Sequence, residues 1–173
     1  MIVVRPERPE DVEAIRAVER AAFGGDAEAA LVDALRAEGD LLGGRSLVAE
    51  ADGAIVGHLA LSPCTLEPPV ASRPAPMVEA IGPVAVEPGR QRQGIGTALM
   101  HAAIDGARRR GVAMLVLLGH PSYYPRFGFV TARALGALPP ADWNDEAWMA
   151  LPLGDWRPAS PAVVRYPRAF GIG

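Results

Sequence analysis

The sequence predicts an α/β fold, one mixed sheet with helices packed on it, for the whole chain of 173 residues. Three observations lead to this prediction. Residues 46–61 read as two strands joined by Asp52-Gly53, a pair that suits the two-residue turn of an antiparallel hairpin. Residues 80–118 read as strand, helix and strand, an order that gives a right-handed parallel crossover. Residues 9–22 repeat apolar side chains at helical spacing.

The N-terminal half predicts a strand, two helices and the hairpin, in that order. Residues 2–5 form the short first strand, and Gly24 ends the helix that follows it. Asp26 is expected to cap a second helix that ends at Gly39, because its carboxylate suits an N-cap. Residues 63–76 carry five prolines and predict a loop after the hairpin.

The C-terminal half predicts a fourth strand at residues 80–86, although Gly82-Pro83 interrupts it. Proline cannot donate to a strand ladder, so this step indicates either an edge strand or a bulge. The third helix runs from Gly94 to Arg110, and the apolar run at 114–118 predicts a buried parallel strand. The remaining expected elements are a short helix from Pro121 and strands at 129–132, 147–153 and 163–166.

Composition predicts a single domain over residues 1–173 and excludes several classes of function. The net charge of -3 argues against a nucleic-acid partner, and the basic triplet 108–110 is expected to be a solvated helix end. One cysteine, Cys64, permits no internal disulfide and fits a reducing, cytoplasmic setting. The longest apolar run, 112–118, is too short to span a bilayer, and the N-terminus lacks the apolar core of a signal peptide.

A glycine-rich turn lies between the fourth strand and the third helix. The first N–H groups of a helix have no internal partner and the helix dipole is positive there, so such a turn attracts phosphate. The pattern here is Gln91-x-x-Gly94-x-Gly96. A P-loop would need a lysine after the second glycine, and the chain contains no lysine; a dinucleotide fingerprint would need a third glycine where Leu99 stands.

This pattern after a Val-Ala-Val strand resembles the pyrophosphate loop of the GCN5-related N-acetyltransferases (GNAT family), which bind acetyl-coenzyme A. A second motif, Tyr124-x-x-x-Gly128-Phe129, matches the spacing that the family shows after its next strand. The run 123–129, together with 164–171, looks like the bacterial acetyltransferases of YhbS type. The resemblance implies a GNAT fold, in which a mostly antiparallel sheet splays between strands four and five and about four helices flank it.

The resemblance also implies direct transfer of the acetyl group of acetyl-CoA to a primary amine on a small molecule or a protein N-terminus. Backbone groups of the turn would hold the pyrophosphate and those of the fourth strand the pantetheine arm. The expected cofactor-binding residues are Val84, Ala85, Val86, Gln91, Arg92, Gln93, Gly94, Ile95, Gly96 and Thr97. The alternative is a CoA-binding regulatory or interaction module with weak or no turnover.

Two residues are the expected catalytic groups under this resemblance. Tyr124 is the candidate general acid, because a phenol is protonated at neutral pH and can donate to the departing thiolate. Glu79, before the fourth strand, is the candidate general base. His58 and His120 are alternatives, but the apolar neighbours of His58 favour a hydrogen-bonded core histidine. An acceptor that arrives as a neutral amine would need no base.

Other polar and aromatic residues have open or structural interpretations. Glu19 and Asp26 would either bind a cationic substrate or be ordinary surface acids, and Cys64 is expected to be structural. No spacing suggests a metal site. The three tryptophans would either pack the closing strands or line an acceptor cleft, and the C-terminal strand is a candidate for pairing two subunits; the tryptophans are Trp143, Trp148 and Trp156.

Overall fold

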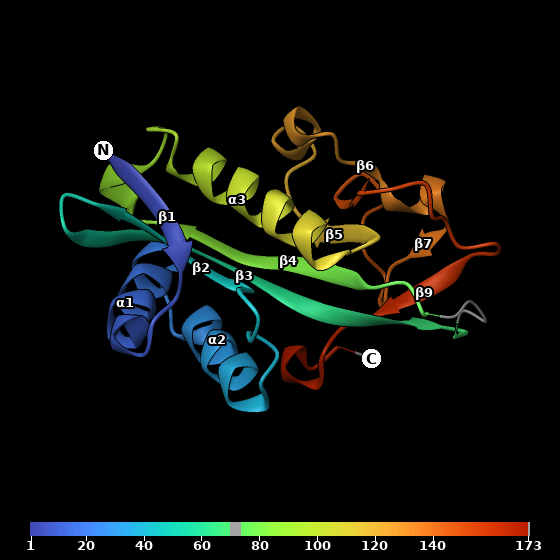
Figure 1. Cartoon of the computed structure of the whole chain (residues 1–173), viewed down its shortest axis with the longest axis horizontal. Coiled ribbons are helices and arrows are strands. Elements are labelled where there is room, and N and C mark those ends of the chain that lie inside the picture. The colour runs from blue at the N-terminus through green and yellow to red at the C-terminus, as the bar shows by residue number, and fades with distance from the viewer. Residues whose placement is uncertain (70–73, 173) are drawn as a thin grey trace. The chain divides into compact units, whose positions relative to one another are not determined.

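The computed structural model describes residues 1–69 and 74–172, and its elements follow the predicted order (Figure 1). The strands and α-helices of this part of the chain are β1 (Ile2–Pro6), α1 (Val12–Phe23), α2 (Ala27–Glu38), β2 (Ser46–Ala51), β3 (Ala54–Glu67), β4 (Val78–Val86), α3 (Ile95–Arg110), β5 (Met114–Leu118), β6 (Val130–Thr131), β7 (Ala137–Leu138), β8 (Trp148–Pro152) and β9 (Ala162–Arg165).

The elements form two compact units. Unit 1 comprises Met1–Leu61 and Gly82–Gly106, and unit 2 comprises Ser62–Ile81 and Ala107–Gly173. The unit boundaries fall inside β3, β4 and α3, so these three elements contribute residues to both units.

In unit 1 the strands lie in the order β1, β2, β3 and β4, and the first three pair antiparallel. The β2–β3 hairpin turns at Asp52 and Gly53, whose φ angles of 54° and 78° are those of the predicted primed turn. These angles and the antiparallel β2–β3 register confirm the hairpin prediction. On β3, the Val56 carbonyl accepts from the Glu87 N–H at 2.9 Å, next to the C-terminal end of β4.

Two adjacent residues of β3 show how helices cover both faces of the unit 1 sheet. Successive strand residues point to opposite faces. A Cβ on Gly57 would lie 2.9 Å from Ile95, so this face carries the N-terminal part of α3. The His58 side chain reaches Glu19 of α1 on the other face. Figure 1 shows α1 and α2 on one side of β2 and β3, and α3 on the opposite side.

In unit 2, β4 pairs parallel with β5 from Val78 opposite Met114 to Ala80 opposite Val116. This is the parallel crossover that the order of elements predicts. The β5 strand also pairs antiparallel with β8, and β8 with β6. The recorded β4–β5 register ends before Gly82-Pro83, where proline removes a ladder donor.

The end of β3 differs from the prediction, because the strand continues through part of the expected proline loop to Glu67. It does so because Thr65–Glu67 pairs with Val163–Arg165 of β9, which a reading of the local sequence does not reveal. The rest of that expected loop includes residues 70–73, which lie outside the described residues. Because β9 also pairs with β7, both of its sides have partners within the chain, which is unfavourable for the expected pairing between subunits.

Three helical expectations are corrected. The expected first helix opens with a 3-10 turn at Pro9–Asp11 before α1 begins. Asp26 makes no side-chain cap to α2; its carboxylate lies 2.5 Å from the Arg20 guanidinium instead. The expected short helix from Pro121 is a 3-10 turn at Tyr124–Phe127, so the described residues contain three α-helices rather than about four.

One face of α3 is shielded from solvent, and it carries apolar residues at helical spacing: Ile95, Leu99, Ala103 and Ala107. Within the described ranges, no helix is both long enough and apolar enough to cross a bilayer.

Candidate active site

The turn between β4 and α3 has the geometry of an anion site. We call residues 91–97 the phosphate loop. Arg92 and Gly94 have φ angles of 60° and 85°, which turn the chain sharply into the helix. The Ala98 N–H donates to the Gly94 carbonyl at 2.9 Å and closes the first helical turn. The amides of Ile95–Thr97 therefore lie ahead of the helical hydrogen-bond pattern and point out of the N-terminus.

Two glutamine side chains of this loop hydrogen-bond to the backbone just before it. The Gln91 side-chain amide donates to the Val86 carbonyl and the Gln93 amide to the Gly89 carbonyl, both at 3.3 Å. Arg90 pairs with Asp52 of the hairpin turn at 3.1 Å.

Arg92 differs from its neighbours in the loop. Its side chain is exposed, and no described residue forms an ion pair with it. A Cβ on Gly94 would meet nothing within 4 Å, so a ligand can approach the backbone closely there. A guanidinium without an ion-pair partner among the described residues, amides outside the helical hydrogen-bond pattern and open space over a glycine together suit the charge and size of a pyrophosphate.

Exposure alternates along the end of β4, the strand that leads into the loop. Ala85 is fully buried, while Val84 and Val86 are partly exposed. The Ala85 carbonyl lies under Gly57 of β3, 3.2 Å from where a Cβ would stand. Close packing of β3, β4 and the first turn of α3 therefore holds the phosphate loop on the sheet of unit 1.

In unit 2, Tyr124 begins the 3-10 turn that follows β5. Its ring is half-buried and packs edge-on against Tyr123 at 5.0 Å and against Phe129 at 5.9 Å between ring centroids. Burial, and then the nearby Tyr123, raise the pKa of the Tyr124 phenol. The phenol is therefore firmly protonated at neutral pH, as a general acid must be.

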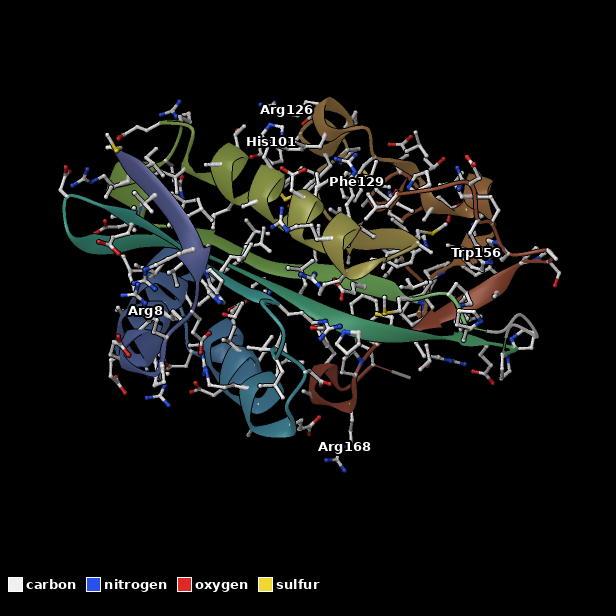
Figure 2. All side chains as sticks on the ribbon, in the orientation of Figure 1. Arg8, His101, Arg126, Phe129, Trp156 and Arg168 are labelled. Carbon is white, nitrogen blue, oxygen red and sulfur yellow. The ribbon has the colours of Figure 1, made fainter. Side chains whose placement is uncertain are left out.

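Arg126 holds this turn in shape. Its guanidinium donates to the Tyr123 carbonyl at 2.9 Å and lies 4.5 Å from the centre of the Tyr123 ring. Figure 2 shows Arg126 at the outer side of the turn, whereas Phe129 is buried. Tyr123 therefore packs within the turn, and Arg126 bonds its backbone and covers its ring.

Glu79, the candidate base, is buried in unit 2 with a cationic partner. It is 1% exposed, and its carboxylate accepts from Arg110 of α3 at 2.6 and 3.3 Å. Arg110 therefore departs from the expected solvated basic triplet. Both carboxylate oxygens of Glu79 are therefore engaged by Arg110.

His58 is a hydrogen-bonded core residue of unit 1, as its apolar strand predicts. Its Nδ1 lies 2.5 Å from Glu19 and its Nε2 lies 2.9 Å from the Ser46 hydroxyl. All three side chains are buried. Glu19 is therefore not a surface acid, and neither ring nitrogen of His58 is open to a substrate.

The same network continues from Ser46 toward the surface. The Ser46 hydroxyl also bonds Glu7, and the Arg36 guanidinium pairs with Glu7 at 2.5 Å. Burial raises the pKa of Glu7, but hydrogen bonds from Arg36 and Ser46 outweigh it and leave the pKa below its usual value. Nothing in the local sequence signals these contacts, since Glu19 and His58 are 39 residues apart.

The tryptophans take the packing role among the two that the sequence left open. Trp148 is buried in the core of unit 2 and donates its indole N–H to the Ala137 carbonyl at 2.9 Å. Trp143 and Trp156 pack against the same core, as does Cys64. In the described part of the chain, no group of His, Cys, Asp and Glu side chains is placed to hold a metal ion.

Comparison with known proteins places these features in context. A family model described as an acetyltransferase (GNAT) domain matches residues 3–132. The chain is 36% identical to two uncharacterized N-acetyltransferases of Escherichia coli, YjhQ over 69% of this chain and YhbS over 76%. The match spans 64% of the length of YjhQ and 75% of that of YhbS.

Two solved structures are similar over nearly the whole chain. One is E. coli YhbS in complex with CoA, with a TM-score of 0.89, 30% identity, and coverage of 98% of this chain and 92% of that one. The other is a GNAT family acetyltransferase from Brucella melitensis in complex with acetyl-CoA. It has a TM-score of 0.80 and 34% identity, and 98% of each chain is covered.

Proposed function

Because the chain belongs to the GNAT family and is an N-acetyltransferase, we propose that it transfers the acetyl group of acetyl-CoA directly to a primary amine. The acceptor is a small molecule or a protein N-terminus. The observation that carries this proposal is the phosphate loop, which combines the amides of the α3 N-terminus with a sharp turn and an exposed Arg92. The relatives solved with CoA and acetyl-CoA support it.

The proposed cofactor contacts follow the geometry of unit 1. The amides of residues 92–97 bind the pyrophosphate, and Arg92 adds a charge-assisted contact. The Gln91 and Thr97 side chains lie within the same loop and can add contacts to the cofactor. The Gln91 amide nitrogen, however, already donates to the Val86 carbonyl. Main-chain groups of Val84–Val86 bind the pantetheine arm, and an N–H near Val86 polarises the acetyl carbonyl.

Tyr124 is the proposed general acid. The amine nitrogen forms a bond to the acetyl carbonyl carbon, and the carbon–sulfur bond breaks with its electron pair on sulfur. Tyr124 gives its proton to that sulfur and regains one from solvent, while the nitrogen loses a proton to solvent. The raised pKa of Tyr124 keeps its proton in place until sulfur gains charge.

We assign no side chain as the general base. Glu79 is engaged by Arg110, and His58 is engaged at both nitrogens. We therefore propose that the acceptor reacts as its neutral amine and that Glu79 joins β4 to the end of α3. On this proposal, the rate rises with pH as the acceptor amine loses its proton.

Calorimetric titration with acetyl-CoA and CoA, followed by thiol release on a panel of amines, tests the function. Tight binding with release on one or more amines supports it. Binding without release favours a CoA-binding module, and no binding overturns the assignment of the phosphate loop. All 17 lysine and arginine residues of the chain are arginine, so no lysine side chain in these 173 residues competes with the added amines.

Replacing Tyr124 with phenylalanine separates binding from chemistry. We expect kcat to fall by about 100-fold, the typical contribution of a general acid, while acetyl-CoA binding is unchanged. Tyr123→Phe is the matched control and should retain kcat, because Tyr123 acts through ring packing. An unchanged kcat in Tyr124→Phe would remove Tyr124 as the acid.

A further inference from the structure

The Tyr124 ring occupies the space that a side chain at position 119 would need. A Cβ on Gly119 would lie 2.3 Å from Tyr124 Cε2, 3.0 Å from Cδ2 and 3.1 Å from Cζ. These separations are well below about 3.5–4.0 Å, the distance at which carbon atoms normally pack. The edge of the ring, including the carbon that bears the hydroxyl, therefore rests directly on the Gly119 backbone.

Gly119 cannot easily move away from the ring. It follows the last residue of β5, and its N–H donates to the Ala147 carbonyl at 3.0 Å, just before β8. Its φ lies outside the left-handed region, so the backbone itself would accept an L-residue. Any added side chain would thus act on the Tyr124 ring rather than through backbone strain.

Packing alone fixes the ring. Tyr123 and Phe129 contact it edge-on, and Gly119 supports its Cε2 edge. No hydrogen bond from the Tyr124 hydroxyl to another described residue is present, so that hydroxyl is available to a reacting group while its direction depends on the ring.

We propose that Gly119 is the positioning residue of the reaction: by lacking a side chain, it lets the Tyr124 ring lie across the end of β5 and directs the phenol. This inference rests on the proposed function, in which Tyr124 is the general acid. It also makes the glycine in Leu118-Gly119-His120 a requirement of catalysis rather than of the turn.

The main test is Gly119→Ala, compared with Gly154→Ala. Gly154 is also in unit 2, has a φ outside the left-handed region, and would meet nothing within 4 Å of an added Cβ. We expect Gly119→Ala to lower kcat by about 10- to 100-fold, the cost of misplacing a catalytic group, with KM for acetyl-CoA changed less than about twofold. Gly154→Ala should match the wild type.

A double-mutant cycle tests whether Gly119→Ala lowers kcat through the Tyr124 hydroxyl. In a Tyr124→Phe background, Gly119→Ala should cause no more than about a twofold further loss of kcat, because the hydroxyl it misplaces is already absent. An equal loss in both backgrounds would overturn the positioning role. Wild-type kcat in Gly119→Ala would overturn it as well.

Tyrosinate absorbance keeps the inference testable if no transferase activity is found. The Tyr124 signal is the difference between the wild-type and Tyr124→Phe titrations. Gly119→Ala should push the ring into solvent and lower the Tyr124 midpoint toward about 10, its ordinary value. An unchanged midpoint would overturn the proposed contact, whereas a shifted midpoint without acetyl transfer would contradict only the function.

Thermal unfolding covers the case in which Gly119→Ala folds poorly. Tyr124→Ala vacates the space over position 119, so the drop in Tm caused by Gly119→Ala should largely disappear in that background. The same drop in both backgrounds would show that the ring is not what position 119 contacts.

Discussion

Arg90, just before the phosphate loop, forms an ion pair with Asp52, whereas Arg92, inside the loop, forms none with a described residue. This difference makes a matched pair of variants. We expect Arg92→Ala to weaken acetyl-CoA binding by about 10- to 100-fold, the range for losing a hydrogen bond to a charged group, with kcat at saturation little changed. Calorimetric titration measures it.

Arg90→Ala is the control for that variant. It removes the same charge from the same turn but breaks only an exposed ion pair, which contributes little. It should bind acetyl-CoA within about threefold of the wild type. Equal weakening by both substitutions would mean that Arg92 acts through net charge rather than through contact with the phosphates.

Asp11 predicts how the stability of unit 1 depends on pH. Its carboxylate accepts two hydrogen bonds from Arg5, at 2.6 and 3.0 Å, and one from the Arg8 N–H at 2.7 Å. The Arg5 hydrogen bonds lower the pKa of Asp11 and outweigh the effect of its burial. A carboxyl group whose pKa is lower in the folded state stabilises the fold at pH values above its unfolded pKa. That stabilisation is lost as pH falls through the folded pKa.

Asp11→Asn should therefore cost about 1–2 kcal/mol near neutral pH, because hydrogen bonds to a charged group are stronger than those to a neutral one. The difference from wild type should shrink as pH falls below about 4, the unfolded carboxyl value. Urea unfolding across pH measures it. Asp26→Asn, which breaks an exposed pair with Arg20, is the control and should change stability by less than about 0.5 kcal/mol.

At the scale of elements, Gly57 sets how closely α3 approaches the sheet. An added Cβ would lie 2.9 Å from Ile95 and 3.1 Å from Leu99, both in the first turns of the helix. Gly57→Ala should cost about 1–3 kcal/mol through overpacking and should weaken acetyl-CoA binding by moving the phosphate loop. Gly89→Ala, where a Cβ meets nothing within 4 Å, should do neither. Denaturant unfolding and calorimetry distinguish them.

Elements that the sequence predicted well are those specified by adjacent residues. The strand at Met114–Leu118 and the ends of α2 and α3 matched, because apolar periodicity and glycine stops are local signals. The extension of β3 was missed because its partner is far along the chain: Glu67 and Arg165 are 98 residues apart.

The candidate site divides in the same way. The phosphate loop and Tyr124 are contiguous motifs, so the sequence could locate both before any contact was known. The pairing of Arg110 with Glu79 depends on where β4 and the end of α3 meet, and spacing within one segment carries no signal for it. The Tyr124 ring over Gly119 is a contact within one segment, but it depends on how the chain folds back after β5, which the motif spacing does not specify.

At the scale of the whole molecule, we propose that residues 1–173 fold as one domain although they form two compact units. The unit boundaries lie within β3, β4 and α3 rather than in a linker, so neither unit can unfold without disrupting elements of the other. Calorimetry should show one transition, with equal calorimetric and van't Hoff enthalpies. Two resolved transitions would contradict this, and a ligand-free sample is the condition to use.

The buried network of unit 1 fixes the direction of its own hydrogens. Arg36 has only donors, so the ionised Glu7 accepts from it and also takes the single hydroxyl hydrogen of Ser46. Ser46 must then accept from His58, whose Nε2 carries a hydrogen and cannot receive one. In a serine hydrolase the serine hydroxyl donates to the histidine, whereas here His58 donates to Ser46. Ser46 therefore stabilises the fold and is not placed to attack a substrate.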